Sequence, residues 1–388
     1  MSIPSADVAL DGPLPAMDVA GRIDRLRAAM PAEPEDVEGD GVSPLEALVV
    51  TSLTNIRYLT GFAGSAGLLF VLGERNVLVT DGRYAEQSVE QIAAAGADVT
   101  VEVAPAARQA EVCAGLVRGA GAARVGLEAA HVSWARQQAM ATKWFPGVEL
   151  VATLGLVEGL RRAKDAGELA RVARAAAIAD RALASVVDQL EEGPTEAAFG
   201  LALDTEMRRL GATGPSFETI VASGPNAAKP HHRPSGRRIG AGEPVVLDFG
   251  ALCDGYCSDI TRTVWVGELA DPELAEVVRV VTEAQAAGVA AVADGVACAE
   301  VDRVCREVIG SAGWGEQFVH GTGHGVGLDI HEAPSVAATS TDTLAIGHVV
   351  TVEPGVYLPG RGGVRVEDTV AVTATGRTPL TNAPKEHR

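Results

Sequence analysis

VVLDFGALCDGYCSDITRTV, residues 245–264, places two carboxylates inside runs of strand-forming residues. Asp248 follows three apolar residues, and Asp259 lies eleven positions further on, in the next predicted strand. A strand interior is an unfavourable place for a charge that nothing compensates. A turn near LCDG would pair the strands as a hairpin and turn both carboxylates to one face. Such carboxylates repel each other unless a cation or a shared proton lies between them.

The same pattern recurs near the C-terminus. Glu353 ends the predicted strand in VVTVEPG, and Glu367 lies in the β-rich run GGVRVEDTVAV. Arg365 precedes Glu367 by two positions and therefore shares its strand face. Any one of these acids has a plain alternative reading as an exposed side chain on an edge strand. Four of them, with a histidine cluster between them in sequence, favour one common site.

That cluster is HGTGHGVGLDIHE, residues 320–332, which holds three of the eight histidines, His320, His324 and His331. A nucleotide loop, a metal site and a structural turn are the alternatives. The segment contains neither G-x-G-x-x-G after a strand nor G-x-x-x-x-G-K-[ST], which argues against nucleotide binding. We expect the glycines to allow close backbone approach, one histidine to bind metal, and the others to orient substrate and move protons.

Charge balance suggests what the site binds. The four carboxylates supply four negative charges, which two divalent cations would neutralise, and His324 could add a neutral nitrogen ligand. Carboxylate-rich ligation with one histidine suits Mn²⁺, with Co²⁺, Fe²⁺ or Zn²⁺ as alternatives. A pair of such ions would acidify water and polarise a carbonyl, which is hydrolase chemistry.

The order of predicted elements indicates two domains behind a short tail. We expect a flexible tail over 1–17 and an α/β domain over 18–155, where short strands alternate with helices. Residues 156–388 twice show helices followed by strands, including a long helix over 165–192 that stops at the Gly-Pro of EEGPT. This predicts an α+β domain with an internal pseudo-repeat, its helices packed over one antiparallel sheet.

Composition excludes several classes of function. The formal net charge is −19 and no block of lysine and arginine occurs, so we expect no nucleic-acid partner. No apolar run is long enough to span a membrane, and the N-terminus lacks the features of a signal peptide. The five cysteines lack zinc-type spacing and suit a reducing compartment, so a cytoplasmic location is expected.

At these motifs the chain resembles the prolidase/aminopeptidase P family of pita-bread metallopeptidases. HGTGHGVGLDIHE fits the histidine signature of the family, and LDFGALCDGYCSDITRT, TVEPGVY and GGVRVEDT fit its flanking motifs in order. The resemblance spans roughly 156–380. TNIRYLTGFAGSAGLLFV and VTDGRYAEQ in the N-terminal half are similar to the creatinase-type domain of the family.

The resemblance implies a ligand set for two metals. Asp248 would chelate one metal, Asp259 and Glu367 would bridge both, and His324 with Glu353 would hold the other.

It also implies roles around the metals. His231 in KPHHRPS, His320 and His331 would contact substrate, and Glu353 or a site histidine would shuttle protons. Arg365 would support Glu367, and Tyr256 and Thr261 would support the region of Asp259. His232 is treated as a bystander.

The implied reaction is hydrolysis of the bond between an N-terminal residue and proline in short peptides, by a homodimer. A strict dipeptidase must bind the free carboxylate of proline, and some prolidases place an arginine for this a few residues after the HE pair. This chain has Ser335 there and no Lys or Arg between His331 and Glu353. Arg233, Arg361 or Arg365 could substitute. This departure from the family pattern favours an Xaa-Pro aminopeptidase, with a prolidase as the alternative. Creatinase, methionine aminopeptidase and a metal-free binding module are the more distant alternatives.

Overall fold

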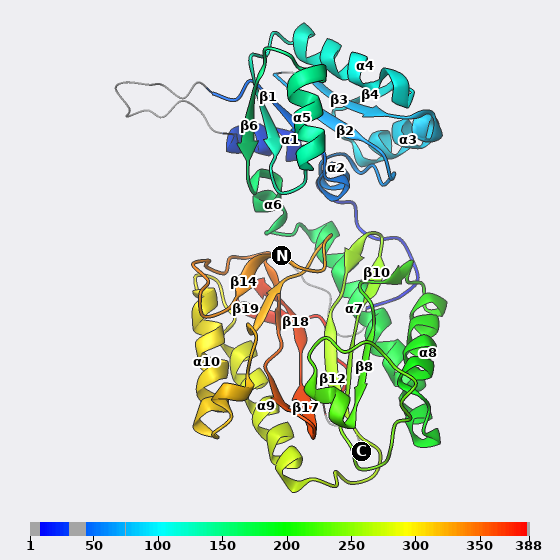
Figure 1. Cartoon of the computed structure of the whole chain (residues 1–388), viewed down its shortest axis with the longest axis vertical. Coiled ribbons are helices and arrows are strands. Elements are labelled where there is room, and N and C mark those ends of the chain that lie inside the picture. Colours follow the sequence, from blue (N-terminus) through cyan, green and yellow to red (C-terminus); the bar gives the residue numbers. More distant parts are fainter. Residues whose placement is uncertain (1–7, 31–43, 74, 386–388) are drawn as a thin grey trace. The chain divides into compact units, whose positions relative to one another are not determined.

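The computed structural model describes residues 8–30, 44–73 and 75–385, which form two compact units (Figure 1). The N-terminal unit comprises described residues between 16 and 161. The C-terminal unit comprises 8–15 together with 162–385. Within these ranges no helix is both long and apolar enough to cross a membrane.

The N-terminal unit is an α/β domain built on one mixed sheet of six strands in the order β4-β3-β2-β1-β5-β6. The pairs β3–β4, β1–β5 and β5–β6 are parallel, and the other two are antiparallel. Its helices and strands are α1 (Arg22–Ala29), β1 (Ala47–Val50), α2 (Leu53–Thr60), β2 (Leu68–Leu72), β3 (Arg75–Thr80), α3 (Ala85–Ala95), β4 (Thr100–Val103), α4 (Ala106–Gly119), β5 (Arg124–Glu128), α5 (Trp134–Ala139), β6 (Glu149–Thr153) and α6 (Leu156–Arg161).

The C-terminal unit contains two successive sets of helices followed by antiparallel strands, as the pseudo-repeat predicts. The first set is α7 (Ala166–Val186), α8 (Glu196–Arg209), β7 (Gly214–Pro215), β8 (Ile220–Ser223), β9 (Val245–Phe249), β10 (Ala251–Cys253), β11 (Tyr256–Cys257) and β12 (Ile260–Val264). The second set is α9 (Pro272–Ala291), α10 (Cys298–Ser311), β13 (Gly323–Gly325), β14 (Glu332–Val336), β15 (Val349–Val352), β16 (Gly355–Leu358), β17 (Gly362–Arg365), β18 (Asp368–Thr373) and β19 (Gly376–Pro379).

The two sets have equivalent sheet orders. The strands run β12-β9-β8 in the first half, and β18-β15-β13 form the matching part of the five-stranded sheet in the second. Figure 1 shows the strands of this unit between α7 and α8 on one side and α9 and α10 on the other. The middle strands of the two halves, β9 and β15, therefore occupy corresponding positions.

The expectation of one continuous antiparallel sheet is wrong in detail. All strand pairs of the unit are antiparallel, but among the described residues they form four separate sheets. The two halves meet through a backbone hydrogen bond from Glu367 N to Thr261 O of 3.1 Å. Pro354, which follows β15, has no N–H to extend a ladder there. We call this boundary between β12 of the first half and β18 of the second half the seam. Acids occupy it instead of a strand pair.

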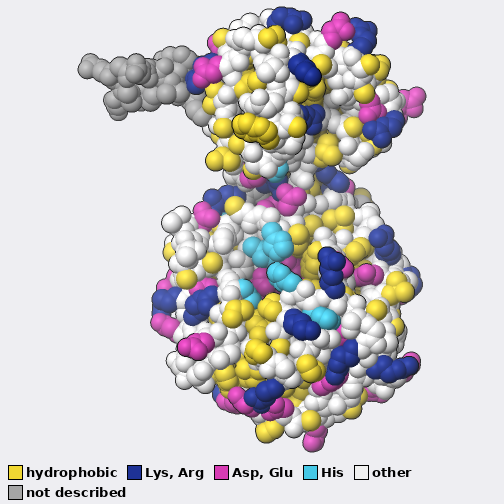
Figure 2. Space-filling view, viewed as in Figure 1, with side chains coloured by type: hydrophobic (Ala, Val, Ile, Leu, Met, Phe, Trp, Pro, Cys, Tyr) yellow, Lys and Arg dark blue, Asp and Glu magenta, His cyan; other side chains and the backbone are white. Residues whose placement is uncertain are grey.

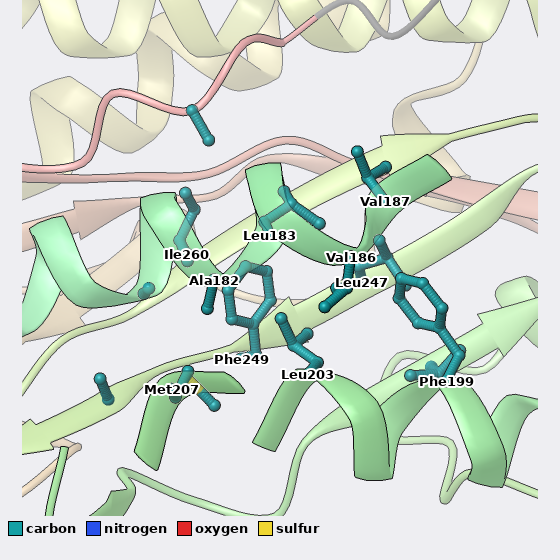
Figure 3. Packing of buried hydrophobic residues seen from close by; sticks show 14 of the residues in the cluster. Ala182, Leu183, Val186, Val187, Phe199, Leu203, Met207, Leu247, Phe249 and Ile260 are labelled. Carbon is teal, nitrogen blue, oxygen red and sulfur yellow. The ribbon is translucent and has the colours of Figure 1, made fainter. Parts of the chain in front are cut away.

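The long helix predicted over 165–192 is confirmed as α7 followed by a 3-10 turn, Val187–Glu192. It ends at Gly193, whose φ of +62° is readily adopted by glycine. The Thr195 side chain then accepts from Ala198 N and caps α8. Figure 3 shows the apolar faces of these two helices packed against Phe249 and Leu247 of β9.

The N-terminal residues differ from the predicted loose tail over 1–17. Residues 1–7 lie outside the described residues, whereas three arginines of α7 donate hydrogen bonds to the carbonyls of Val8, Gly12 and Pro15. The units divide between residues 161 and 162, because α6 lies with the N-terminal unit. The expected boundary at 155/156 places this helix on the other side.

Two leucines on one helix provide a test of this packing. Leu203 of α8 is fully buried, whereas Leu201 is 68% exposed. We expect Leu203→Ala to lower the free energy of unfolding by about 2–5 kcal/mol, because it removes apolar contacts and leaves a cavity. Leu201→Ala serves as the matched control and should change it by less than about 0.5 kcal/mol. Equal effects in urea unfolding would contradict the packing of α8 described here.

Candidate metal centre

The first pair of acids lies on one face of the β9–β12 ladder. Asp248 stands directly opposite Thr261 in the antiparallel register, so both side chains share a face. Asp259 precedes Thr261 by two positions and therefore lies on the same face. The intervening β10–β11 hairpin turns at Asp254 and Gly255, which both have positive φ. The hairpin predicted from the spacing is confirmed, with Thr261 rather than Asp259 facing Asp248.

The second half supplies the other pair at equivalent points. Glu353 directly follows β15, and Glu367 directly precedes β18. Glu353 N donates to Thr322 O at 2.7 Å, which ties this acid to the histidine-rich segment. Each half of the pseudo-repeat thus delivers two carboxylates to the seam between the halves.

His324 of β13 stands among these acids. Its Nε2 lies 3.6 Å from Asp259 Oδ2 and 3.4 Å from Glu353 Oε1. The Nδ1 lies 3.1 Å from the carbonyl oxygen of Gly325. A carbonyl only accepts, so this bond places a proton on Nδ1 and, in the neutral ring, leaves the Nε2 lone pair facing carboxylates. A cation between them would turn that repulsion into attraction.

The pKa values of two of the acids also indicate a cation-binding site. Burial, and then repulsion from Glu367 and Asp248, raise the pKa of Asp259 well above its ordinary value. Burial, and then repulsion from Glu353 and Asp248, raise the pKa of Glu367 in the same way. Glu367 Oε1 is buried and has no hydrogen-bond partner among the described residues. Ligand atoms of Asp259, His324 and Glu367 lie within 4.8 Å of one another. The group therefore fits a divalent cation.

A second cluster, Glu128, His131 and Glu158 of the N-terminal unit, also has ligand atoms within 4.8 Å. Its most buried member, Glu128, accepts from the backbone N–H groups of Thr51 and Ser52 and from the side chain of Asn55. These donors satisfy the carboxylate without a cation. The contrast with Glu367 distinguishes a structural network from a metal centre.

Arg365 is the cation that the chain itself provides at the seam. Its Nη2 lies 2.5 Å from Asp248 Oδ2, and its Nε donates to Thr261 Oγ1 at 3.1 Å. Thr261 Oγ1 in turn donates to Glu367 Oε2 at 2.7 Å. One arginine thereby positions an acid from each half.

Tyr357 of β16 extends this network and was missed in the sequence, although it lies in the quoted TVEPGVY motif. Arg365 Nη1 donates to Tyr357 Oη at 2.8 Å, and this hydroxyl lies 2.8 Å from His320 Nε2. His320 Nδ1 lies 2.7 Å from Gly321 O and therefore donates to it. The hydroxyl then donates to Nε2, so both ring nitrogens of His320 are engaged by the chain.

A cavity of about 480 Å³ opens over the acids. Figure 2 shows histidine side chains gathered on this face of the C-terminal unit, with carboxylates between them. The predicted ligands and His231, His320, His331 and Arg365 all line the cavity. The other lining residues are Phe217, Glu218, Ile220, Pro230, Gly321, Gly323, Ile330, Ser335 and Ala337.

The three arginines suggested as binders of the proline carboxylate all form ion pairs in the structure. Arg365 is held by Asp248, and Arg361 pairs with Asp271 and Glu273. Arg233, 81% exposed, pairs with Glu218 at 3.2 Å and is not among the residues that line the cavity.

Of the two residues expected to support Asp259, Thr261 lies within the site, whereas Tyr256 contacts a helix. Thr261 contacts Glu367 and Arg365, within the site. Tyr256 instead donates to Glu168 of α7 at 2.8 Å. His232, treated as a bystander, lies 2.9 Å from Glu196 of α8.

Comparisons with known proteins agree with this architecture. The family described as Metallopeptidase family M24 matches residues 170–374, and the Creatinase/Prolidase N-terminal domain matches residues 22–163. An uncharacterised peptidase of Bacillus subtilis is 39% identical over 342 residues, which are 88% of this chain and 95% of that protein.

Solved structures show the same relationship. An Xaa-Pro dipeptidase from Bacillus anthracis has a TM-score of 0.85 at 39% identity, covering 94% of this chain and 98% of the other. An X-Pro aminopeptidase from Thermotoga maritima has a TM-score of 0.81 at 33% identity, covering 88% and 96%. With the pita-bread fold, the acid-lined seam and these matches together, the chain belongs to metallopeptidase family M24, preceded by a creatinase/prolidase-type N-terminal domain.

Proposed function

We propose that this metallopeptidase removes the N-terminal residue from short peptides with proline in the second position. The observation that carries the proposal is the group formed by two buried acids, two partly buried acids and His324 beneath a cavity of peptide size. Relatives that act on Xaa-Pro bonds share the fold over most of its length. An Xaa-Pro dipeptidase activity is the alternative within the same family.

Asp248, Asp259, His324, Glu353 and Glu367 would hold two divalent cations, for which we propose Mn²⁺. When bound, such ions polarise a carbonyl and lower the pKa of water. Manganese is favoured because the ligand set consists mainly of carboxylate oxygens with one imidazole. Co²⁺, Fe²⁺ and Zn²⁺ remain the alternatives on the same donors.

The chain's own groups then divide the remaining work. His231 and His331 line the cavity and would contact the substrate. Glu353 reaches both His324 and the cavity, which suits a carboxylate that moves a proton between water and the leaving amine. His320 would orient substrate by its fixed ring, because its two nitrogens are bonded to Gly321 and Tyr357.

The charge of the cavity lining favours an aminopeptidase over a dipeptidase. A dipeptide presents the carboxylate of its proline close to the scissile bond, and burial of that charge requires a positive partner. Among the described lining residues Arg365 is the one arginine or lysine, and it is bound to Asp248. A longer peptide carries an amide at that point and needs no cation.

Two further properties are inferred with the function. All five cysteines are buried and unpaired, which suits the reducing cytoplasm. The family resemblance suggests a homodimer whose N-terminal domains limit access to short peptides, and the acidic chain is not expected to bind nucleic acid.

A two-substrate assay tests the function. The protein would be stripped with a chelator, reloaded with Mn²⁺, and given an Xaa-Pro dipeptide and the matching Xaa-Pro-Xaa tripeptide, with products identified by mass spectrometry. We expect faster cleavage of the tripeptide, because its second amide replaces the unmatched carboxylate. Faster cleavage of the dipeptide would establish the alternative. Cleavage of neither by metal-loaded protein would refute the Xaa-Pro specificity.

Ser335 offers a gain-of-function test, because it is exposed and lines the cavity. Ser335→Arg should raise kcat/KM for the dipeptide relative to the tripeptide by about tenfold, the effect of one charge-assisted hydrogen bond. Ser335→Met, similar in length but uncharged, is the control and should leave the ratio unchanged. The same ratio in both variants would show that a cation at this position does not control substrate length.

Metal content tests the ligand set. Glu367→Gln replaces a buried carboxylate that has an unpartnered oxygen, so we expect bound divalent ions to fall from about two per chain to one or fewer. Glu128→Gln, in the hydrogen-bonded cluster of the N-terminal unit, should leave the ion count unchanged. Plasma mass spectrometry of dialysed protein would measure both. Full metal content in Glu367→Gln would exclude this carboxylate as a ligand.

A further inference from the structure

Glu196, the first residue of α8, is fully buried outside the cavity and is surrounded by hydrogen-bond donors. Its Oε1 accepts from Ser223 N at 2.8 Å, Ser223 Oγ at 2.7 Å and Asn226 Nδ2 at 3.0 Å. Its Oε2 accepts from His232 Nε2 at 2.9 Å, Ser235 N at 3.0 Å and Ser235 Oγ at 2.6 Å. One carboxylate thus gathers donors from four residues.

Ser223 is the last residue of β8, and the other three donors lie in the segment that follows it, residues 224–237, which we name the His231 loop. Beyond the 3-10 turn Gly224–Ala228 this loop has no helix or strand. The start of α8 adds two further bonds, from Glu196 N to Arg237 O and from Ala197 N to Ser235 O. Because no strand ladder runs along this loop, its conformation depends on these contacts together with the Arg237–Glu243 ion pair and the bond from Gly224 N to Pro244 O.

The opposite side of the loop faces the candidate metal centre. Pro230 and His231 line the cavity, and Pro230 O lies 3.4 Å from Arg365 Nη1. His231 and His232 are neighbours in the chain, yet one lines the cavity while the other binds Glu196. Through these two adjacent histidines, the loop links the buried Glu196 carboxylate to the cavity.

The carboxylate is ionised in this setting. Burial raises the pKa of Glu196, but hydrogen bonds from Ser235, Asn226 and Ser223 outweigh burial and bring the pKa to about 2. A glutamine would keep one acceptor oxygen and turn an N–H₂ group toward donors, so it cannot satisfy this arrangement. The charge also lies in the first turn of α8, where the helix dipole favours an anion.

We propose that Glu196, acting through His232 and the two serines, is a positioning residue that fixes His231 in the cavity for peptide hydrolysis. This inference rests on the proposed function, because His231 matters only if it contacts the substrate. His232 is then part of the positioning machinery rather than a bystander.

A double-mutant cycle tests the proposal in full-length protein loaded with Mn²⁺. Glu196→Gln should lower kcat/KM for the tripeptide by about 10- to 100-fold, mainly through kcat, the size of effect expected from a small displacement of a group at the reaction centre. In the His231→Ala background the same change should lower kcat/KM by less than about threefold. Ser235→Ala, which keeps the charge, should give a smaller loss of the same kind.

Controls separate positioning from a general loss of structure. Glu128→Gln removes a comparably hydrogen-bonded carboxylate of the N-terminal unit and should leave kcat and KM unchanged in the folded protein. Metal content should stay at the wild-type level in Glu196→Gln, because no predicted ligand contacts this residue. Losses that multiply fully in the double mutant would overturn the proposal.

Hydrogen–deuterium exchange gives an answer that does not depend on activity. Glu196→Gln should speed exchange in peptides covering 224–237 while peptides covering 318–332 keep the wild-type rate. Unchanged exchange over 224–237 would overturn the proposal even if the protein cleaved Xaa-Pro peptides. Faster exchange in a protein that cleaves no such peptide would support the anchoring role and refute the proposed function instead.

Discussion

The fold brings together carboxylates that repel one another, two of them buried and two partly buried. Asp248, Asp259, Glu353 and Glu367 meet at the seam between two half-domains, where Arg365 supplies one compensating charge. Burial makes each uncompensated negative charge costly, and the raised pKa values of Asp259 and Glu367 report that cost. Cation binding would relieve it, so metal affinity and the stability of the seam are linked.

The pseudo-repeat explains how one chain brings these acids together. A hairpin alone would place two carboxylates on one face, but two equivalent sets of strands place a pair on each side of a common seam. The strand ladders stop at this seam, which is crossed by individual backbone bonds such as those from Glu367 N to Thr261 O and from Cys257 N to Gly327 O. The break in the sheet therefore provides the room that ligands and substrate require.

The histidines around the seam depend on anchors outside it. Glu196 holds the loop of His231, and a pair formed by Asp302 and Arg306 of α10 binds Thr322 and the carbonyl of His320. The third, His331, precedes Glu332, which forms a buried ion pair with Lys164 at 2.6 Å. Because strand ladders do not hold these loops, their side chains are positioned by contacts with charged groups outside the cavity.

Local sequence patterns predicted much of this architecture. Alternating apolar runs marked the strands beside Asp248 and Glu353, and helical periodicity with the Gly193 and Thr195 signals marked α7 and α8. Such patterns report backbone preference and burial over a few residues, which is why they work for element type and for the placement of acids within strands. The motif order also predicted that the acids and His324 would meet, and they line one cavity.

The amino-acid sequence therefore sufficed to predict the main helices and strands, the repeat and the chemical identity of the groups at the seam. Only the folded structure shows that the sheet breaks there, that Tyr357 joins His320 to Arg365 and that Glu196 anchors the His231 loop. It also shows that Arg365, already paired with Asp248, is the one arginine or lysine among the described residues that line the cavity. The partners in the side-chain contacts of Tyr357 and Glu196 lie 8 to 39 residues apart, and most lie on different elements. Their meeting is set by how strands and helices pack, which no short-range pattern encodes.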